Sequence, residues 1–245
     1  MKIGTIVEGS TDRLLLKAII DHIYPGQHTY HDLQPADRGE TFGERGSGWK
    51  GVRRFCFDVH QQLNNTLSNF IVDYAFDLLV IHVDADIANE SDLQDGIDEP
   101  IIDVSQSCPP VYPTVIKSRQ VIMKWLQVEE DQLPPQVIFA IPAQDSEHWV
   151  FATLFPDDEM CKESKYECVH EHHQRPAYKL SLQKYGSIVR RKKGKLKKSI
   201  LRYRLILPDV VAGWRDACKI CTQAQLFTDE LLGHHGNSRR LVQEK

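Results

Sequence analysis

Short β-branched apolar runs alternate with longer stretches of helical apolar spacing through the first 155 residues. The apolar runs predict buried strands over 2–7, 28–33, 78–83 and 136–141. Apolar residues that recur every three or four positions predict helices between these strands, over about 11–24, 51–68 and 115–127. Such alternation is typical of a right-handed, mainly parallel sheet flanked by helices, so we expect the α/β class.

The pattern changes after about residue 157, where the chain becomes charged and only weakly periodic. A terminal amphipathic helix is predicted over 210–232. The stretch over 89–113 is acidic and aperiodic, which indicates a surface excursion. We therefore expect a sheet domain over 1–155 and a mostly helical, basic region over 156–245.

Acidic residues follow two of the predicted strands at the point where each strand ends. Glu8 comes directly after the first strand, and Asp84 and Asp86 come directly after the third. Because ligands of an open parallel sheet sit beyond the carboxyl ends of its strands, we expect these three carboxylates to converge. Carboxylates held close together repel one another, and a hard oxygen-seeking cation such as Mg²⁺ or Mn²⁺ relieves that repulsion.

These segments resemble a known family. The apolar strand that leads into Glu8-Gly9-Ser10-Thr11-Asp12, with the later strand that leads into Asp84-Ala85-Asp86, resembles the Toprim domain of topoisomerases, primases and the overcoming-lysogenization-defect nucleases. The opening Glu-Gly-x-x-Asp-x-x-x-Leu is most similar to the bacterial nucleases of phage defence. The resemblance covers about residues 1–155. It implies a Toprim-like (Rossmann-like) sheet and a catalytic, Mg²⁺-binding set of Glu8, Asp84 and Asp86.

Two further carboxylates are candidate metal ligands. Asp12 lies one turn into the first predicted helix, where it would point back toward the same end of the sheet. Glu147 follows the fourth strand as Glu8 follows the first, and some of the defence nucleases carry an extra acidic residue there. The alternative is a doubly wound domain whose acidic residues cap helices and face water.

Positive charge is concentrated in one stretch of a chain whose formal net charge is −4. The candidate nucleic-acid-binding residues in this stretch are Arg190, Arg191, Lys192, Lys193, Lys195, Lys197 and Lys198. Three interpretations are open: a solvated helix face or loop, contact with phosphates, or docking to an acidic protein. Lys50, in a glycine-rich segment after the second strand, is a further candidate for contact with a phosphate.

The cysteines and the absence of long apolar runs indicate the compartment. The six cysteines form no compact framework, so we expect mostly free thiols in a reducing compartment. A zinc site is not favoured, because the Cys and His residues over 161–173 match no standard finger spacing. No apolar run approaches the roughly 20 residues that cross a membrane, and Glu8 and Asp12 interrupt the one candidate signal segment, so we expect a cytoplasmic protein.

The expected function is that of a Mg²⁺- or Mn²⁺-dependent nuclease that hydrolyses phosphodiester bonds of DNA or RNA. The chain contains no Walker loop, and the resemblance implies a phage-defence (abortive infection) effector that acts with a separate ABC-type ATPase. The alternative is a catalytically silent Toprim-like module that binds a partner protein through its C-terminal region. A homodimer is a further option for its assembly.

Overall fold

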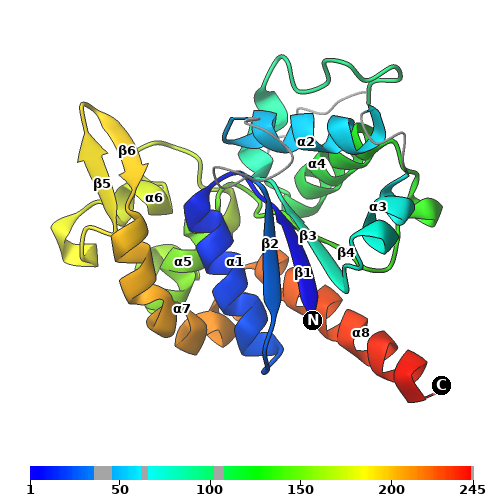
Figure 1. Cartoon of the computed structure of the whole chain (residues 1–245). Helices are drawn as coiled ribbons and strands as arrows, with labels where there is room; N and C mark the ends of the chain where they lie inside the picture. The colour runs from blue at the N-terminus through cyan, green and yellow to red at the C-terminus, as the bar shows by residue number, and fades with distance from the viewer. Residues whose placement is uncertain (36–45, 62–65, 102–107, 244–245) are drawn as a thin grey trace.

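A parallel β-sheet forms the centre of the molecule in the computed structural model (Figure 1). The structure describes residues 1–35, 46–61, 66–101 and 108–243 of the chain. Among these, the sheet has the order β2-β1-β3-β4 and is parallel throughout. Its strands are β1 (Lys2–Ile6), β2 (Thr29–Gln34), β3 (Leu78–His82) and β4 (Val137–Ala140). The expected α/β class is confirmed.

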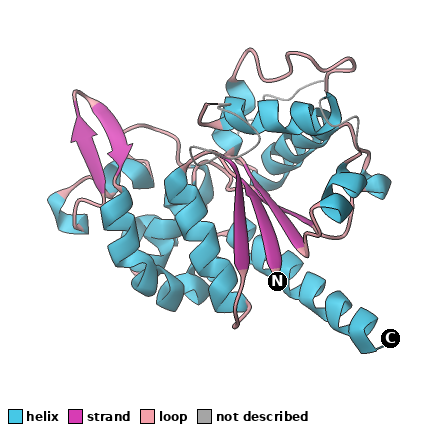
Figure 2. Ribbon diagram, viewed as in Figure 1, coloured by secondary structure: helices cyan, strands magenta, loops and turns pink. Residues whose placement is uncertain are grey.

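Helices cover both faces of this sheet (Figure 2). On one face lie α1 (Ser10–Ile23), α5 (Ser146–Leu154), α7 (Ile200–Ile220) and α8 (Thr222–Gln243). On the other face lie α2 (Trp49–Gln61), α3 (Leu67–Asp73) and α4 (Val111–Leu126). Strand β3 is apolar up to His82 because both of its faces are buried. Leu78 and Val80 pack against the helices of the first face, whereas Leu79 and Ile81 pack against those of the second.

The single helix predicted over 51–68 is wrong, because the segment forms two helices. Helix α2 ends at Gln61 and α3 begins at Leu67. Thr66 caps the second helix, since its hydroxyl oxygen accepts a hydrogen bond of 3.2 Å from the backbone N–H of Asn69. A threonine in this role satisfies an N–H that would otherwise lack a partner, so it favours a new start over continuation.

The single terminal helix predicted over 210–232 is also wrong, because α7 and α8 meet at Cys221. This residue has an extended backbone, with φ −111° and ψ 112°. The buried carboxylate of Glu167 accepts hydrogen bonds from the backbone N–H groups of Thr222 (2.8 Å) and Gln223 (3.1 Å). A carboxylate at this position complements the positive end of α8, so it fixes where the second helix begins.

The basic stretch is neither a helix face nor a loop but an antiparallel ribbon, of β5 (Val189–Lys192) and β6 (Lys195–Lys198). Lys193 and Gly194 join the strands with φ values of 51° and 76°. Two positive φ values in a two-residue connection match the twist of a hairpin. The ribbon projects from the body of the molecule beside α6 (Pro176–Lys179) and the start of α7 (Figure 1).

The region after residue 155 shares a hydrophobic core with the sheet domain. Tyr203, Trp214 and Phe227 are buried in the same cluster as Ile3 and Leu15. The boundary at residue 155 therefore does not separate two hydrophobic cores. That the two parts of the chain have different functions stays a prediction. No described helix is both long and apolar enough to cross a membrane.

Five short 3₁₀ helices complete the described chain: η1 (Ala85–Asn89), η2 (Glu130–Gln132), η3 (Glu159–Lys162), η4 (Tyr166–Cys168) and η5 (Gln183–Tyr185). A disulfide joins Cys108, before α4, to Cys168, at the end of η4. The other four cysteines are free thiols, and three of them are buried. Mostly free thiols were expected from the sequence, and the disulfide was not predicted.

Candidate functional site

Glu8 and Asp84 lie side by side at the carboxyl edge of the sheet. They follow β1 and β3, which are neighbours in the sheet. The backbone N–H of Asp84 donates a hydrogen bond of 2.7 Å to Oε1 of Glu8. The parallel register of the two strands therefore brings together two carboxylates that are far apart in the sequence, as the strand-end pattern predicts.

Ser146 connects this pair to Asp12 and lies next to Glu147. Its backbone N–H donates a hydrogen bond of 3.1 Å to Oδ1 of Asp84, and its hydroxyl donates one of 2.7 Å to Oδ1 of Asp12. Asp12 is in the first turn of α1, and Glu147 is in the first turn of α5. Both carboxylate side chains are almost fully buried. Glu8, Asp12, Asp84 and Glu147 thus form one group, which we call the acidic cluster.

Lys198, the last residue of the ribbon, lies inside the acidic cluster. Its Nζ is 2.9 Å from Oδ1 of Asp12 and 3.1 Å from Oε1 of Glu147. The hydroxyl of Tyr203, on α7, also donates a hydrogen bond to Glu147. The sequence analysis assigned Lys198 to nucleic-acid binding, whereas the structure pairs it with two buried carboxylates.

Asp86 lies at the outer side of the cluster and pairs with Arg175. Nη2 of Arg175 is 2.8 Å from Oδ2 of Asp86 and 2.8 Å from Oδ2 of Asp145. The Asp86 side chain is 34% exposed, while that of Asp145 is buried and contacts Nδ1 of His148 at 2.7 Å. Asp86 also lines a polar cavity of about 260 Å³, together with Gln144 and Arg175. Solvent therefore reaches the site from this side.

Three carboxyl groups of the site hold their protons to higher pH than usual. The pKa of Glu8 is raised to about 8, that of Glu147 to about 7 and that of Asp86 to about 6, and burial is the largest cause of each increase. The negative charge of Asp84 contributes to all three increases. Asp84 is thus an electrostatic neighbour that the three groups share.

Positive side chains act in the opposite direction at two other carboxyl groups. Burial alone would raise the pKa of Asp12, but the charges of Lys198 and His82 bring it below its usual value. In the same way, His148 and Arg175 lower the pKa of Asp145 against the effect of its burial. The site thus contains carboxylates that stay ionised beside others that favour a proton.

His82 supplies a further positive charge beneath the cluster. It is fully buried at the end of β3, with Nε2 3.3 Å from Oδ1 of Asp84. Burial alone would lower the pKa of this imidazole, but Asp84, Asp12 and Glu8 together raise it to about 9. The positive charge of His82 does not fully offset the burial of Glu8 and the negative charges around it, because the pKa of Glu8 stays raised to about 8.

The donor atoms of the site fit a hard divalent cation. Carboxylate oxygens are the ligands that Mg²⁺ and Mn²⁺ prefer. Glu8 and Asp84 are the adjacent pair, and Asp12, Asp86 and Glu147 surround them. In the part of the chain that the structure describes, no three His, Cys, Asp or Glu side chains already have a metal-holding arrangement. The fit therefore rests on the donor chemistry and on the raised pKa of Glu8, because a cation would supply the positive charge that this carboxylate lacks.

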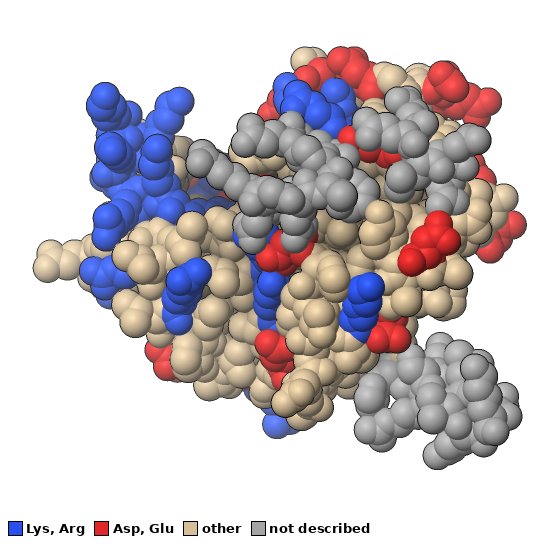
Figure 3. Space-filling view, in the orientation of Figure 1, with Lys and Arg blue, Asp and Glu red and all other residues tan. Residues whose placement is uncertain are grey.

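Among the described residues, no ion pair joins Lys50 to the acidic cluster. Its ammonium group pairs with Asp92 and lies 5.1 Å from the centre of the Trp49 ring. The remaining candidate cations of the basic stretch are exposed on the ribbon. Figure 3 shows them as a dense group of blue side chains at the position of β5 and β6. Their role in nucleic-acid binding stays a prediction.

Four residues of the site were not predicted from the sequence: Ser146, Asp145, Arg175 and His82. Two of these had a usable signal, because Asp145 and Ser146 stand beside Glu147 at the end of a predicted strand. His82 lies inside a buried strand, where a histidine has no distinctive pattern. Arg175 reaches the site from a separate segment, so only the folded chain reveals its role.

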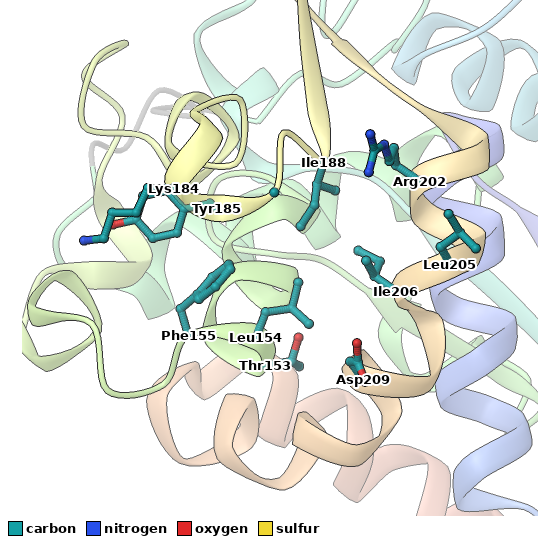
Figure 4. A pocket seen from close by; sticks show the side chains of 11 residues that line it. Thr153, Leu154, Phe155, Lys184, Tyr185, Ile188, Arg202, Leu205, Ile206 and Asp209 are labelled. Atoms are coloured by element: carbon teal, nitrogen blue, oxygen red, sulfur yellow. The ribbon is translucent and has the colours of Figure 1, made fainter.

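A second cavity lies away from these carboxylates, between the end of α5, η5 and α7 (Figure 4). It has a volume of about 450 Å³. Leu154, Ile188 and Ile206 give it an apolar lining, while Arg202 and Asp209 lie on its α7 side. No residue of the acidic cluster lines it, so the larger of these two cavities is not the candidate site.

Comparison with known proteins identifies no relative: no family model, no curated protein and no solved structure matches the chain. The functional interpretation therefore depends on the geometry of the site and on its strand-end motifs.

Proposed function

We propose that the protein is a Mg²⁺- or Mn²⁺-dependent nuclease that hydrolyses phosphodiester bonds of DNA or RNA. The observation that carries this proposal is the contact between Glu8 and Asp84 across two neighbouring parallel strands, with Asp12 connected to Asp84 through Ser146 and to Glu147 through Lys198. The resemblance of the two motifs to the Toprim domain supports the same chemistry. A bound cation would neutralise charge on the non-bridging phosphate oxygens and activate water.

The protein's own residues have separable tasks in this proposal. Glu8 and Asp84, with Asp12 and Asp86, would hold the cation. Glu8 has a pKa of about 8 before a cation binds, so it can exchange a proton near neutral pH. Lys198 holds Asp12 and Glu147 in place, since its Nζ contacts both; it keeps Asp12 ionised and partly offsets the effect of burial on the pKa of Glu147. Arg175 holds Asp86 and Asp145 at the solvent side of the site; it helps to keep Asp145 ionised and partly offsets the effect of burial on the pKa of Asp86.

The resemblance also supports a biological setting. Nucleases of phage defence often act with an ABC-type ATPase, and this chain has no Walker loop of its own. We therefore propose an abortive-infection effector whose ATPase is a separate protein.

A catalytically silent binding module is the second candidate. One observation favours it: Lys198 and Arg175 already pair with four acidic side chains of the site. Removal of one partner from a buried ion pair is destabilising, so these contacts can have a structural role without any catalysis. The two candidates differ in whether the wild-type protein cleaves nucleic acid and whether that cleavage requires the carboxylates of the site.

A nuclease assay with purified protein separates these candidates. Plasmid DNA and a structured RNA are incubated with Mg²⁺, Mn²⁺ or EDTA, using the wild type, Glu8→Gln and Asp84→Asn. We expect metal-dependent cleavage by the wild type and a loss of roughly 100-fold or more in each variant, because a positioned charged group contributes about that much. Glu90→Gln is the matched control, since Glu90 is exposed and follows η1.

The circular dichroism spectrum and the urea midpoint establish that each variant is folded. Wild-type levels of cleavage in folded Asp84→Asn would refute the proposal. Absence of cleavage by the wild type with every metal, alone and with any ATPase encoded beside it, would favour the silent module.

A further inference from the structure

The two strands of the basic ribbon sort its side chains onto two different faces. Strand pairing places Arg190 opposite Lys197, and Lys192 opposite Lys195. Residues that are directly opposite share a face, and successive residues alternate between faces. One face therefore carries four cations: Arg190, Lys192, Lys195 and Lys197. The other face carries Val189, Arg191, Leu196 and Lys198.

The second of these faces packs against the protein through Val189, Leu196 and Lys198, while Arg191 on the same face is exposed. Val189 is 1% exposed, and Leu196 packs against the core that contains α1 and α7. The guanidinium of Arg191 lies 5.3 Å from the centre of the Tyr178 ring. Lys198 reaches the acidic cluster. The contacts of this inner face hold the ribbon against the protein. The face with the four cations is therefore directed outward.

Repulsion among the four cations of the outer face destabilises the ribbon, and no described residue offsets this repulsion by pairing with them. These residues are exposed, and none of the four forms an ion pair with a described residue. Like charges directly opposite each other destabilise a strand pair, and an isolated two-stranded hairpin is marginally stable in water. A bound polyanion would remove this repulsion, so the arrangement is one that favours an anionic ligand.

The composition of the ribbon distinguishes between classes of polyanion. The outer face has no apolar side chain, whereas the centre of a protein interface is mostly apolar. The whole ribbon over Val189–Lys198 has no aromatic residue. Single-stranded nucleic acid is commonly held by bases stacked on aromatic rings, and this surface offers none. A duplex presents phosphates without requiring stacking, and its major groove in B-DNA admits a two-stranded ribbon.

We propose that the outer face of the ribbon, formed by Arg190, Lys192, Lys195 and Lys197, binds the phosphate backbone of duplex nucleic acid without regard to sequence. Lys197 directly precedes Lys198 on β6, so this face begins one residue, roughly 3.4 Å along the strand, from the residue whose side chain reaches the acidic cluster, and it extends to Lys195, about 10 Å along the strand from Lys198. The duplex class of substrate rests on the proposed nuclease function, whereas binding itself does not.

The test compares two variants with the same change of net charge. In the outer-face variant, Arg190, Lys192, Lys195 and Lys197 are all replaced by glutamine. In the control variant, four exposed lysines elsewhere are replaced by glutamine: Lys162, Lys165, Lys184 and Lys219. Fluorescence anisotropy then measures binding of duplex DNA, duplex RNA and single-stranded DNA in EDTA, between about 50 and 200 mM salt.

We expect the outer-face variant to flatten the log–log salt dependence of duplex binding by up to about 3–4 units, at roughly 0.9 per lost phosphate contact. The control variant should keep the wild-type slope. The duplex arms show whether DNA, RNA or both are bound. Equal slopes in the wild type and the outer-face variant would overturn the proposal, and so would tighter binding of single strands than of duplexes.

Two further measurements test whether the variant is folded and separate this inference from the proposed function. The outer-face variant should have an unchanged or higher urea midpoint than the wild type, because it loses repulsive pairs of cations. The double variant Arg190→Gln with Lys197→Gln provides a smaller change of the same kind. Binding in EDTA without cleavage in Mg²⁺ or Mn²⁺ would contradict the nuclease proposal alone. Cleavage of duplexes with full rate and affinity by the outer-face variant would contradict this inference alone.

Discussion

Replacement of Glu147 by glutamine should make the stability of the protein less dependent on pH. Glu147 is buried, with its side chain 2% exposed, and its pKa is raised from 4.5 to about 7. Burial is the main cause, and the nearby carboxylates add to it against the attraction of Lys198. Glutamine keeps the shape of the side chain and an oxygen that can accept the hydrogen bond from Tyr203.

The sign and size of the effect follow from proton linkage. Because the folded protein holds the proton of Glu147 more tightly than the unfolded chain does, this residue destabilises the fold as pH rises from 4.5 to about 7. A shift of this size corresponds to about 3 kcal/mol in total. About 2.5 kcal/mol of it falls between roughly pH 5 and pH 8. Glu147→Gln should therefore lose about that much less stability than the wild type over this interval.

Urea unfolding in EDTA at several pH values between about 5 and 8 measures this difference. Glu8 and His82 also have raised pKa values, and they titrate in the same direction in both proteins, so the comparison isolates Glu147. Glu159→Gln is the matched control, because the Glu159 side chain is 87% exposed. Parallel pH profiles for the wild type and Glu147→Gln would refute the reasoning.

Two other predictions concern how the helices are held. Gly213→Ala should destabilise the protein by about 1–3 kcal/mol, because a Cβ at Gly213 would collide with the backbone oxygen of Thr153. Urea midpoints of the variant and the wild type measure this loss. Gly233→Ala is the control, since a Cβ there would meet no atom within 4 Å. Glu167→Gln should cost roughly 1–3 kcal/mol and increase hydrogen exchange at the start of α8, since a charged acceptor for its N–H groups is lost; unchanged exchange there would argue against Glu167 as the anchor of α8.

The sequence predicts the sheet well because each strand is both apolar and followed by a distinct polar segment. Strand β3 is buried on both faces, so its apolar run is uninterrupted and easy to recognise. The helix boundaries were less predictable, because they depend on contacts. The start of α8 is set by Glu167, which lies 55 residues away in the sequence from Thr222. Periodicity contains no information about such a partner.

The candidate site was likewise predictable in part. Glu8 and Asp84 could be paired from the sequence, because both follow strands and parallel strands share an edge. The ribbon carried a local signal as well, since Lys193-Gly194 between two charged runs is a hairpin connection. The position of Lys198 inside the acidic cluster could not be predicted from charge alone. It requires the register of β5 with β6 and the packing of Val189 into the core.

The disulfide between Cys108 and Cys168 gives the stability of this fold a dependence on its chemical surroundings. The bond closes a loop of 60 residues that contains α4, β4 and α5, and therefore Asp145, Ser146 and Glu147. Restricting an unfolded chain over a loop of that length contributes about 4 kcal/mol in the chain-entropy model. In a reducing compartment this contribution is absent, because thiols there stay unpaired. Glu147, one of the four carboxylates of the acidic cluster, is thus carried on a segment whose covalent closure depends on the thiol–disulfide balance around the protein.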